Sequence, residues 1–310
     1  MSSVREQKIG LAMASLTAFL WGFLAIAMKV ATDFVPVNTI VWFRFAFAFV
    51  MLALIVGLSR PKRLRILVRP PPLGIVAALA LTLNYVGYLT GLDWTTPSNA
   101  QVLIQLAPLM LATGGVFVFK ERMVRAQIYG VVLALIGFTV FGWDQFESSN
   151  VVSNHLLMGN AIIFLGAFAW TVYAMIQKAL LMRGHEPQDL NLLLYGVPAI
   201  TMWPLVDFEL LAGLSFGMWM LMVFLGANTL VAYGALGEAF KRLPAYKVAL
   251  IVTLNPLITI MTMKTLEALE VEWVPEDRVG LLGYASALLV VTGIGVVLVK
   301  GGKREDSVDT

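Results

Sequence analysis

The stretch 9-IGLAMASLTAFLWGFLAIAM-28 contains 20 residues and no ionisable side chain. A helix of about 20 apolar residues is long enough to cross the roughly 30 Å hydrocarbon core of a bilayer. The segment before it, residues 1–8, is short and polar. We therefore interpret this stretch as a retained first membrane-spanning helix rather than a cleaved signal peptide.

The rest of the 310-residue chain has the same character. Hydrophobic residues make up 59% of it and charged residues only 13%, whereas soluble domains average about 25% charged residues. A folded chain of this size could not hide so much apolar surface from water, so its main solvent is lipid. The absence of cysteine excludes disulfides and thiolate metal sites, and the formal net charge of +3 is too small to indicate a nucleic-acid partner.

Nine runs free of charge, and a tenth that is interrupted only by Arg44, divide the chain into candidate spans. We expect an all-α integral membrane protein with ten transmembrane helices. The runs are 9–28, 36–58, 70–92, 94–119, 126–143, 156–177, 190–206, 210–237, 248–263 and 279–299.

The basic residues predict the orientation of these spans. If the N-terminus is cytoplasmic, 18 of the 22 Lys and Arg residues fall on the cytoplasmic side and two, Lys264 and Arg278, on the other, while Lys29 and Arg44 lie within or at the ends of helices. Short cytoplasmic loops carry an excess of Lys and Arg. We therefore expect both termini to be cytoplasmic.

Three weak matches indicate an internal repeat. The pattern A-F-x-W followed by Lys occurs at 18–29 and at 167–178; Gly, Leu and Pro at 87, 89 and 97 recur at 234, 236 and 244; and the L-A-P-L of 106–109 resembles the L-N-P-L of 254–257. The offsets agree to within two residues, which favours two halves at 1–150 and 151–310, although apolar helices can also resemble each other by chance.

Five helices in each half is an odd number, so the second half must enter the membrane from the opposite face. Two inverted five-helix repeats can exchange conformations and thereby open alternately to each side. Substrate sites in such proteins lie near the bilayer midplane, between the halves.

Several features together resemble one family. Arg44 lies early in the second span, the P-S-N-A stretch 97–100 leads to Pro108, and Lys120-Glu121-Arg122 follows the fourth span. Over about residues 9–300 this ordered set is similar to the EamA type of the drug/metabolite transporter superfamily. The resemblance implies export or exchange of small metabolites, commonly amino acids, across a bacterial inner membrane. The acidic stretch 267–277 stands where the family usually has a short turn. The acidic residues of the external loop 264–278 either attract cations or only keep this loop soluble.

Polar and aromatic residues near the centres of the spans are the candidate substrate contacts, because polar groups at membrane depth usually face a cavity or the bundle interior. The alternatives are hydrogen bonds between helices for the two asparagines Asn84 and Asn228, and simple packing for the two tryptophans Trp21 and Trp170. The candidate substrate-binding residues are Trp21, Asn84, Tyr85, Tyr88, Gln101, Gln105, Trp170, Asn228, Tyr233 and Asn255.

Two prolines in the repeated L-x-P-L segments, Pro108 and Pro256, are candidate hinges. A proline within a helix leaves the carbonyl four residues earlier without its partner, here on Ile104 and Val252. That carbonyl then needs water, a side chain or the substrate as a partner.

Charged residues within or near the spans are few. We expect Lys29 and Arg44 either to form an external vestibule that attracts anions or to have structural roles. In a structural role, Arg44 could extend outward to the interface, cap a carbonyl or pair with Asp33. Glu238 and Lys178 could pair near the cytoplasmic surface. No Asp or Glu lies near the centre of a span, so we expect a facilitator or an exchanger driven by the substrate gradient. An energised antiporter that uses an off-centre group such as Glu238 is the alternative.

The function that these residues favour is secondary transport of a small metabolite by alternating access. An aromatic, amide-rich and uncharged site suits a zwitterion or a neutral solute, and we expect amino acids, aromatic or bulky apolar ones in particular. Another neutral, cationic or nucleotide-like metabolite, a drug, or a channel-like facilitator are the alternatives. No phosphate-binding loop is present, and the two histidines lie in separate predicted loops, which disfavours a lipid-modifying enzyme.

The expected partners are a small-molecule substrate and the lipid bilayer, with no nucleic acid, no cofactor and no metal. The chain is expected to be a monomer or a weak homodimer.

Overall fold

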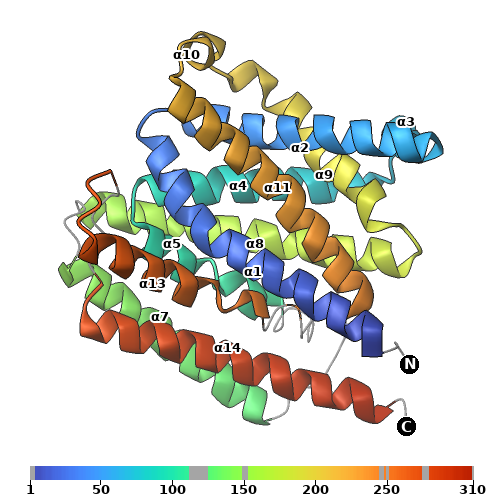
Figure 1. The fold of residues 1–310 in the computed structure, drawn as a ribbon. Helices are drawn as coiled ribbons and strands as arrows, with labels where there is room; N and C mark the ends of the chain where they lie inside the picture. Colours follow the sequence, from blue (N-terminus) through green and yellow to red (C-terminus); the bar gives the residue numbers. More distant parts are fainter. Residues whose placement is uncertain are drawn as a thin grey trace.

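The computed structural model describes residues 4–111, 125–148, 153–243, 248, 251–273 and 279–308. Within them the chain is helical throughout, with short connections (Figure 1). The elements are α1 Val4–Thr32, α2 Val37–Ser59, η1 Pro61–Leu64, α3 Arg65–Val68, α4 Pro72–Asp93, α5 Pro97–Leu103, α7 Arg125–Ser148, α8 Ser153–Met182, α9 Pro187–Thr201, η2 Trp203–Leu205, α10 Phe208–Ala212, α11 Phe216–Arg242, α13 Asn255–Ala268 and α14 Leu281–Val308.

Six of the described helices, α1, α2, α4, α7, α8 and α11, are long and apolar enough to cross a membrane. The other four expected spans coincide with shorter helices. α9 has 15 residues and α13 has 14, the apolar part of α14 covers Leu281–Val296, and α5 has seven residues, beyond which 112–124 lie outside the described residues. The chain is thus an all-helical membrane protein, and the count of ten spans stays a prediction.

Several helices begin where the local sequence dictates. Proline stands in the first turn of α4, α5, α9 and α13, where its missing N–H costs no intrahelical hydrogen bond. The side chains of Thr96 and Ser215 accept hydrogen bonds from the first turns of α5 and α11. Such caps satisfy backbone donors that the helix itself leaves without partners.

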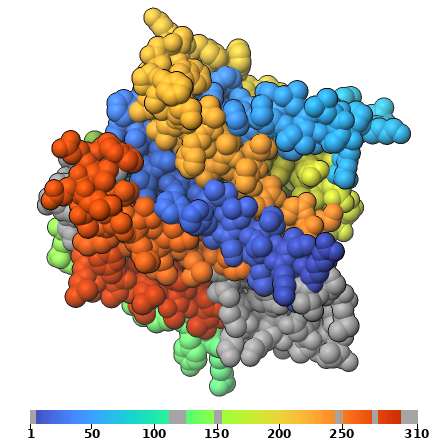
Figure 2. Space-filling view, in the orientation of Figure 1, coloured from blue at the N-terminus to red at the C-terminus, as the bar shows by residue number. Residues whose placement is uncertain are grey.

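The main contacts between helices join the first half of the chain to the second. α1 packs on α11, α4 on α8, α2 on α9, α5 on α13 and α7 on α14, and α1 lies beside both α11 and α13 on the face shown in Figure 2. In Figure 1, α1 runs from lower right to upper left, whereas α8 runs from left to right, and both ends of the chain lie at the lower right. The helix that opens the second half therefore points opposite to the one that opens the first.

Two clusters of buried apolar side chains form the core. The larger one includes residues of α1, α2, α4, α8, α9 and α11, and the smaller one residues of α5, α7, α13 and α14. Large apolar side chains on the outer faces, such as Phe19, Leu165 and Phe168, are more than half exposed. This distribution is suitable for a protein whose surroundings are lipid.

Candidate functional site

A cavity of about 830 Å³, its mouth included, lies between the two halves of the chain. Its walls come from α1, α4 and α5 in the first half and from α8, α11 and α13 in the second, so neither half forms it alone. Nine of the ten candidate substrate contacts line it: Trp21, Asn84, Tyr85, Tyr88, Gln101, Gln105, Trp170, Tyr233 and Asn255. The structure brings these side chains together; their role toward a substrate stays a prediction.

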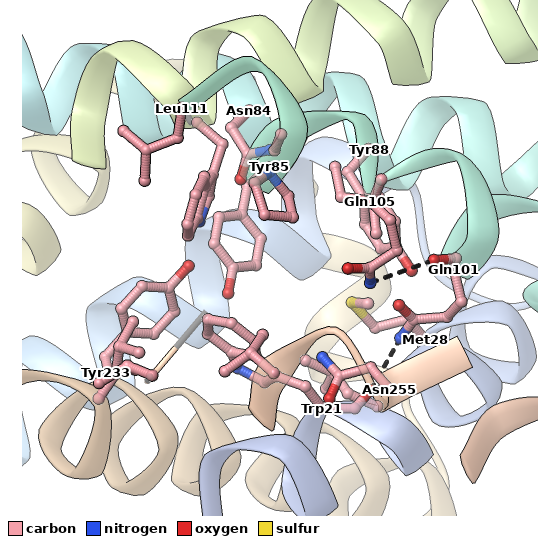
Figure 3. A pocket seen from close by; sticks show the side chains of 18 of the residues that line it. Trp21, Met28, Asn84, Tyr85, Tyr88, Gln101, Gln105, Leu111, Tyr233 and Asn255 are labelled. Atoms are coloured by element: carbon pink, nitrogen blue, oxygen red, sulfur yellow. Dashed lines mark hydrogen bonds between the residues drawn. The ribbon is translucent and has the colours of Figure 1, made fainter. Parts of the chain in front are cut away.

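Aromatic rings make up much of the wall (Figure 3). The ring of Trp21 meets that of Tyr233 edge to face, with 5.3 Å between centroids, and Tyr85 lies 6.0 Å from Tyr233. The hydroxyls of Tyr85 and Tyr233 point toward one another in Figure 3. Trp170, on the second half, contacts Tyr173 at 6.0 Å.

Two glutamines of the first half line the cavity, and one of them, Gln101, links α5 to α1. Gln101 donates from Nε2 to the carbonyl of Trp21 at 2.8 Å, and Gln105 donates to the carbonyl of Gln101 at 3.4 Å. Three polar atoms of the wall are buried and have no hydrogen-bond partner among the described residues. They are Oε1 of Gln105, Nε1 of Trp21 and the hydroxyl of Tyr88. Buried polar atoms are nearly always hydrogen-bonded, so these three atoms of the wall are exceptions that still lack a hydrogen-bond partner.

The sequence allowed either a cavity role or a role in helix packing for Asn84 and Asn228, and the structure places the two side chains differently. Nδ2 of Asn84 donates to the carbonyl of Gly166 at 2.9 Å, so this side chain joins α4 to α8 while it also lines the cavity. Nδ2 of Asn228 donates to the carbonyl of Leu20 at 3.0 Å and joins α11 to α1. Asn228 does not belong to the cavity wall, because its place on α11 faces the backbone of α1.

The two hinge candidates follow breaks in the helical structure rather than bends within continuous helices. The helical hydrogen bonding is interrupted at 104–105 and at 253–254, and Pro108 and Pro256 lie in the helical segments that begin after these turns. When the side-chain amide of Asn255 is turned so that its nitrogen faces these acceptors, the nitrogen can donate to the freed carbonyl of Val252 and to the carbonyl of Ala18, each at 2.9 Å. Pro108 lines the cavity and Pro256 does not.

Arg44 corrects the expectation most clearly. Its side chain is fully buried and points inward, so it neither extends to the interface nor pairs with Asp33. Nε donates to the hydroxyl of Thr229 at 3.1 Å, and the guanidinium lies over the ring of Tyr85, 4.7 Å from its centroid. The pattern of residues around position 44 could not show this, because the partners come from other helices.

Two other charged residues also have partners that the sequence did not indicate. The ammonium group of Lys29 donates to the carbonyl of Asp93, which joins the ends of α1 and α4. Glu238 pairs with Arg242 one turn later on α11, not with Lys178, which is exposed. The segment Lys120-Glu121-Arg122 and part of the loop 264–278 lie outside the described residues.

Sequence reasoning missed the apolar part of the wall. Leu24 and Met28 follow Trp21 at helical spacing, and Leu236 and Phe240 follow Tyr233 at the same spacing. Residues three and seven positions apart share a helix face. Extending that face from the predicted aromatic residue would have found all four.

A cavity lined by both halves of the chain, among helices long and apolar enough to cross a membrane, is the arrangement expected of a transporter. The family comparison agrees: the model of the EamA-like transporter family matches residues 8–143 and again 157–299. The chain therefore belongs to the EamA-like transporter family, and it contains the family's domain twice.

Several relatives match nearly the whole chain. The uncharacterized inner membrane transporter YhbE of Escherichia coli K12 is 35% identical over 292 residues, which cover 93% of this chain and 91% of the relative. An uncharacterized transporter of Haemophilus influenzae is 30% identical over 293 residues, which cover 93% of this chain and 94% of the relative. A more distant relative in Escherichia coli K12, 22% identical with 91% and 92% covered, is described as a probable amino-acid metabolite efflux pump.

A crystal structure of another protein shares the fold. It superposes with a TM-score of 0.66 over 96% of this chain and 98% of the other, with 18% sequence identity. The similarity at this identity concerns the path of the chain only.

Proposed function

We propose that this protein is a secondary transporter that exports or exchanges small metabolites across a bacterial inner membrane, without ATP hydrolysis. The observation that carries the proposal is the single cavity wall built by both halves of the chain. A site lined by both halves can open to one side or the other when helices of the two halves change their packing against each other. Both termini are cytoplasmic in this proposal.

The proposed architecture is ten spans in two inverted repeats, 1–150 and 151–310, that work by alternating access. Three observations support it: the family's domain matches twice, α1 and α8 run in opposite directions (Figure 1), and helical structure is interrupted at 104–105 and at 253–254, in corresponding places of the two halves. Interrupted helices line the substrate sites of many transporters built from inverted repeats.

The proposed substrates are amino acids, with aromatic or bulky apolar ones favoured. The rings of Trp21, Tyr85 and Trp170 offer a large apolar surface, and the polar side chains in the same wall, such as Tyr88 and Gln105, include both donors and acceptors. A relative described as a probable amino-acid metabolite efflux pump supports the same class.

Flux into proteoliposomes tests the proposal. Purified protein should move radiolabelled phenylalanine, tryptophan or leucine down a gradient, with saturation and with acceleration by unlabelled amino acid on the far side. Saturable, exchange-stimulated flux distinguishes a carrier from a channel-like facilitator. Absence of flux for every amino acid would overturn the substrate class and favour another metabolite or a drug.

A pair of tryptophan variants locates the flux in the cavity. Trp170→Ala removes an indole from the wall and should lower the rate or the affinity about tenfold, since a lost aromatic contact is worth roughly 1 kcal/mol or more. Trp143→Ala removes an indole that is 62% exposed on α7 and should leave transport unchanged. Equal effects of both variants would contradict the assignment of the cavity as the site.

A further inference from the structure

The buried guanidinium of Arg44 has only neutral partners among the residues that the structure describes. Nε donates to the hydroxyl of Thr229 at 3.1 Å, Nη1 donates to Sδ of Met28 at 2.7 Å, and Nη2 is buried without a partner. No carboxylate of the described chain lies within ion-pair distance of it. Charged side chains inside a membrane protein normally pair with an opposite charge, because an isolated buried charge is costly.

This charge lies directly behind the cavity wall. Two of the side chains that the guanidinium contacts, Met28 and Tyr85, are themselves part of the wall (Figure 3). A single layer of side chains therefore separates the positive charge from the interior of the cavity. In such a weakly polar environment the attraction of one charge for another falls off much less than in water.

The position of Tyr85 shows which side of the cavity lies next to the charge of Arg44. The ring of Tyr85 lies against the guanidinium at 4.7 Å, and its hydroxyl extends to the cavity side, toward the hydroxyl of Tyr233. Each hydroxyl can donate one hydrogen bond. A negative group placed at these hydroxyls would receive their hydrogen bonds and, at the same time, the attraction of the charge behind them.

We infer that the transported substrate carries a carboxylate, which binds on the Tyr85–Tyr233 side of the cavity, and that Arg44 is the positioning residue that makes the cavity select for it. The inference rests on the proposed transport function and deepens it, because it assigns the side of the cavity that holds the carboxylate and the residue that selects for it. It excludes amines and other cations without an acid group, which an aromatic and amide-lined cavity would otherwise accept through their attraction to the rings.

Matched pairs of compounds test the inference on the full-length protein in proteoliposomes. The probes are phenylalanine, tryptophan and leucine, each compared with the amine that remains when its carboxylate is removed: 2-phenylethylamine, tryptamine and 3-methylbutylamine. Each member of a pair competes against uptake of a labelled acid and is also offered as the labelled substrate itself. We expect the acid of each pair to bind at least about tenfold more tightly than its amine, since tenfold corresponds to only 1.4 kcal/mol.

Variants at position 44 then test whether the charge of Arg44 causes the preference for acids over amines. Arg44→Gln removes the charge and should abolish most of the acid-over-amine ratio, whereas Arg44→Lys keeps a charge and should retain the preference. Thr229→Val removes the hydrogen bond to Nε but leaves the charge in place, so it should lower thermal stability and leave the ratio unchanged. A merely structural Arg44 would change stability in the first and third variants alike, without changing the ratio.

Each outcome has a distinct meaning. Amines that are taken as well as acids by the wild-type protein, or an acid preference that survives Arg44→Gln, would overturn the inference while transport itself stands. Absence of flux for every compound would overturn the proposed function instead, and the inference with it. If Arg44→Gln does not yield folded protein, Arg44→Met, which also removes the charge but leaves no unpaired amide at the buried position, replaces it in the same comparison, and an acid preference that survives this change overturns the inference.

Discussion

At the scale of single residues, similar side chains have different roles because different helices face them. Asn84 and Asn228 each join two helices through one amide hydrogen bond, yet only Asn84 also lines the cavity. Arg44 shows the same dependence on neighbours, since its position early in α2 says nothing of the hydroxyl, sulfur and ring that surround it.

Replacing each asparagine by alanine separates packing from binding. Asn84→Ala and Asn228→Ala should each lower the free energy of unfolding by about 0.6 kcal/mol, the average for a hydrogen bond between membrane helices. Only Asn84→Ala should also change the affinity for transported substrate, measured by competition in proteoliposomes. A change of affinity in Asn228→Ala would show that the cavity extends to α11 at that level.

At the scale of helices, close approach of backbones organises the contact between α4 and α8. A Cβ atom added at Gly91 would lie 2.7 Å from the carbonyl oxygen of Gly159, and one added at Gly166 would lie 3.2 Å from the carbonyl oxygen of Asn84 on α4. Small residues at such crossings let membrane helices gain packing contacts and hydrogen bonds that larger residues would prevent.

Alanine at position 91 should therefore separate these helices. Gly91→Ala should lower stability by about 1–3 kcal/mol, the usual cost of overpacking a tight interior. The control is Gly142→Ala on α7, where nothing lies within 4 Å of the added atom, so thermal unfolding should be unchanged or slightly improved. Equal melting temperatures for the wild type and Gly91→Ala would contradict the close crossing.

One buried carboxylate adds a polar contact to the apolar packing between α7 and α14. Oδ2 of Asp144, buried near the end of α7, accepts a hydrogen bond at 3.1 Å from the backbone N–H of Gly280, just before α14 begins. A negative charge at the start of a helix is favourable because the first N–H groups lack partners in the helix.

Asp144→Asn should lower the free energy of unfolding by about 1 kcal/mol, because the neutral amide is a weaker acceptor at this helix start. Glu147→Gln, which neutralises an exposed carboxylate on the same helix, is the control and should leave stability nearly unchanged. Chemical denaturation in detergent measures both. Equal losses would mean that charge on α7, rather than the contact to α14, is what matters.

At the scale of the whole molecule, ion pairs gather at the end where the described chain begins and ends. Arg242 pairs with Glu6 at 3.0 Å, Arg63 with Asp189 at 3.5 Å and Lys241 with Glu186 at 2.8 Å. The first two pairs join the two halves of the chain. The hydrogen bond from Lys241, together with the charges of Arg63 and Arg60, lowers the pKa of Glu186 below its ordinary value of 4.5.

This lowered pKa predicts a pH dependence of stability. Glu186 binds its proton less readily in the folded protein than in the unfolded chain, so its contribution is fully present above about pH 4.5 and is lost as the pH falls through the folded-state pKa. The wild-type protein should exceed Glu186→Gln in stability by about 0.2–1 kcal/mol at pH 7, as is typical of exposed pairs. The difference should vanish in strong acid, where the carboxylate of Glu186 is protonated in both the folded and the unfolded chain.

The sequence alone determined the all-helical, membrane-embedded class, the positions of the apolar segments and nine of the cavity-lining residues. Hydropathy depends on local composition and can be read from the sequence. Polar groups at membrane depth usually face the interior of the helix bundle or a cavity. That is why Trp21, Tyr85 and Gln105 could be selected without coordinates.

Only the tertiary structure decided which way each side chain turns. It placed Asn228 against α1 instead of in the cavity, put the breaks at 104–105 and 253–254 ahead of the prolines, and buried Arg44 behind Tyr85. The physical reason is the same in each case. The partners of these groups belong to other helices, and the energy of a buried polar or charged group depends on the atoms that packing brings to it.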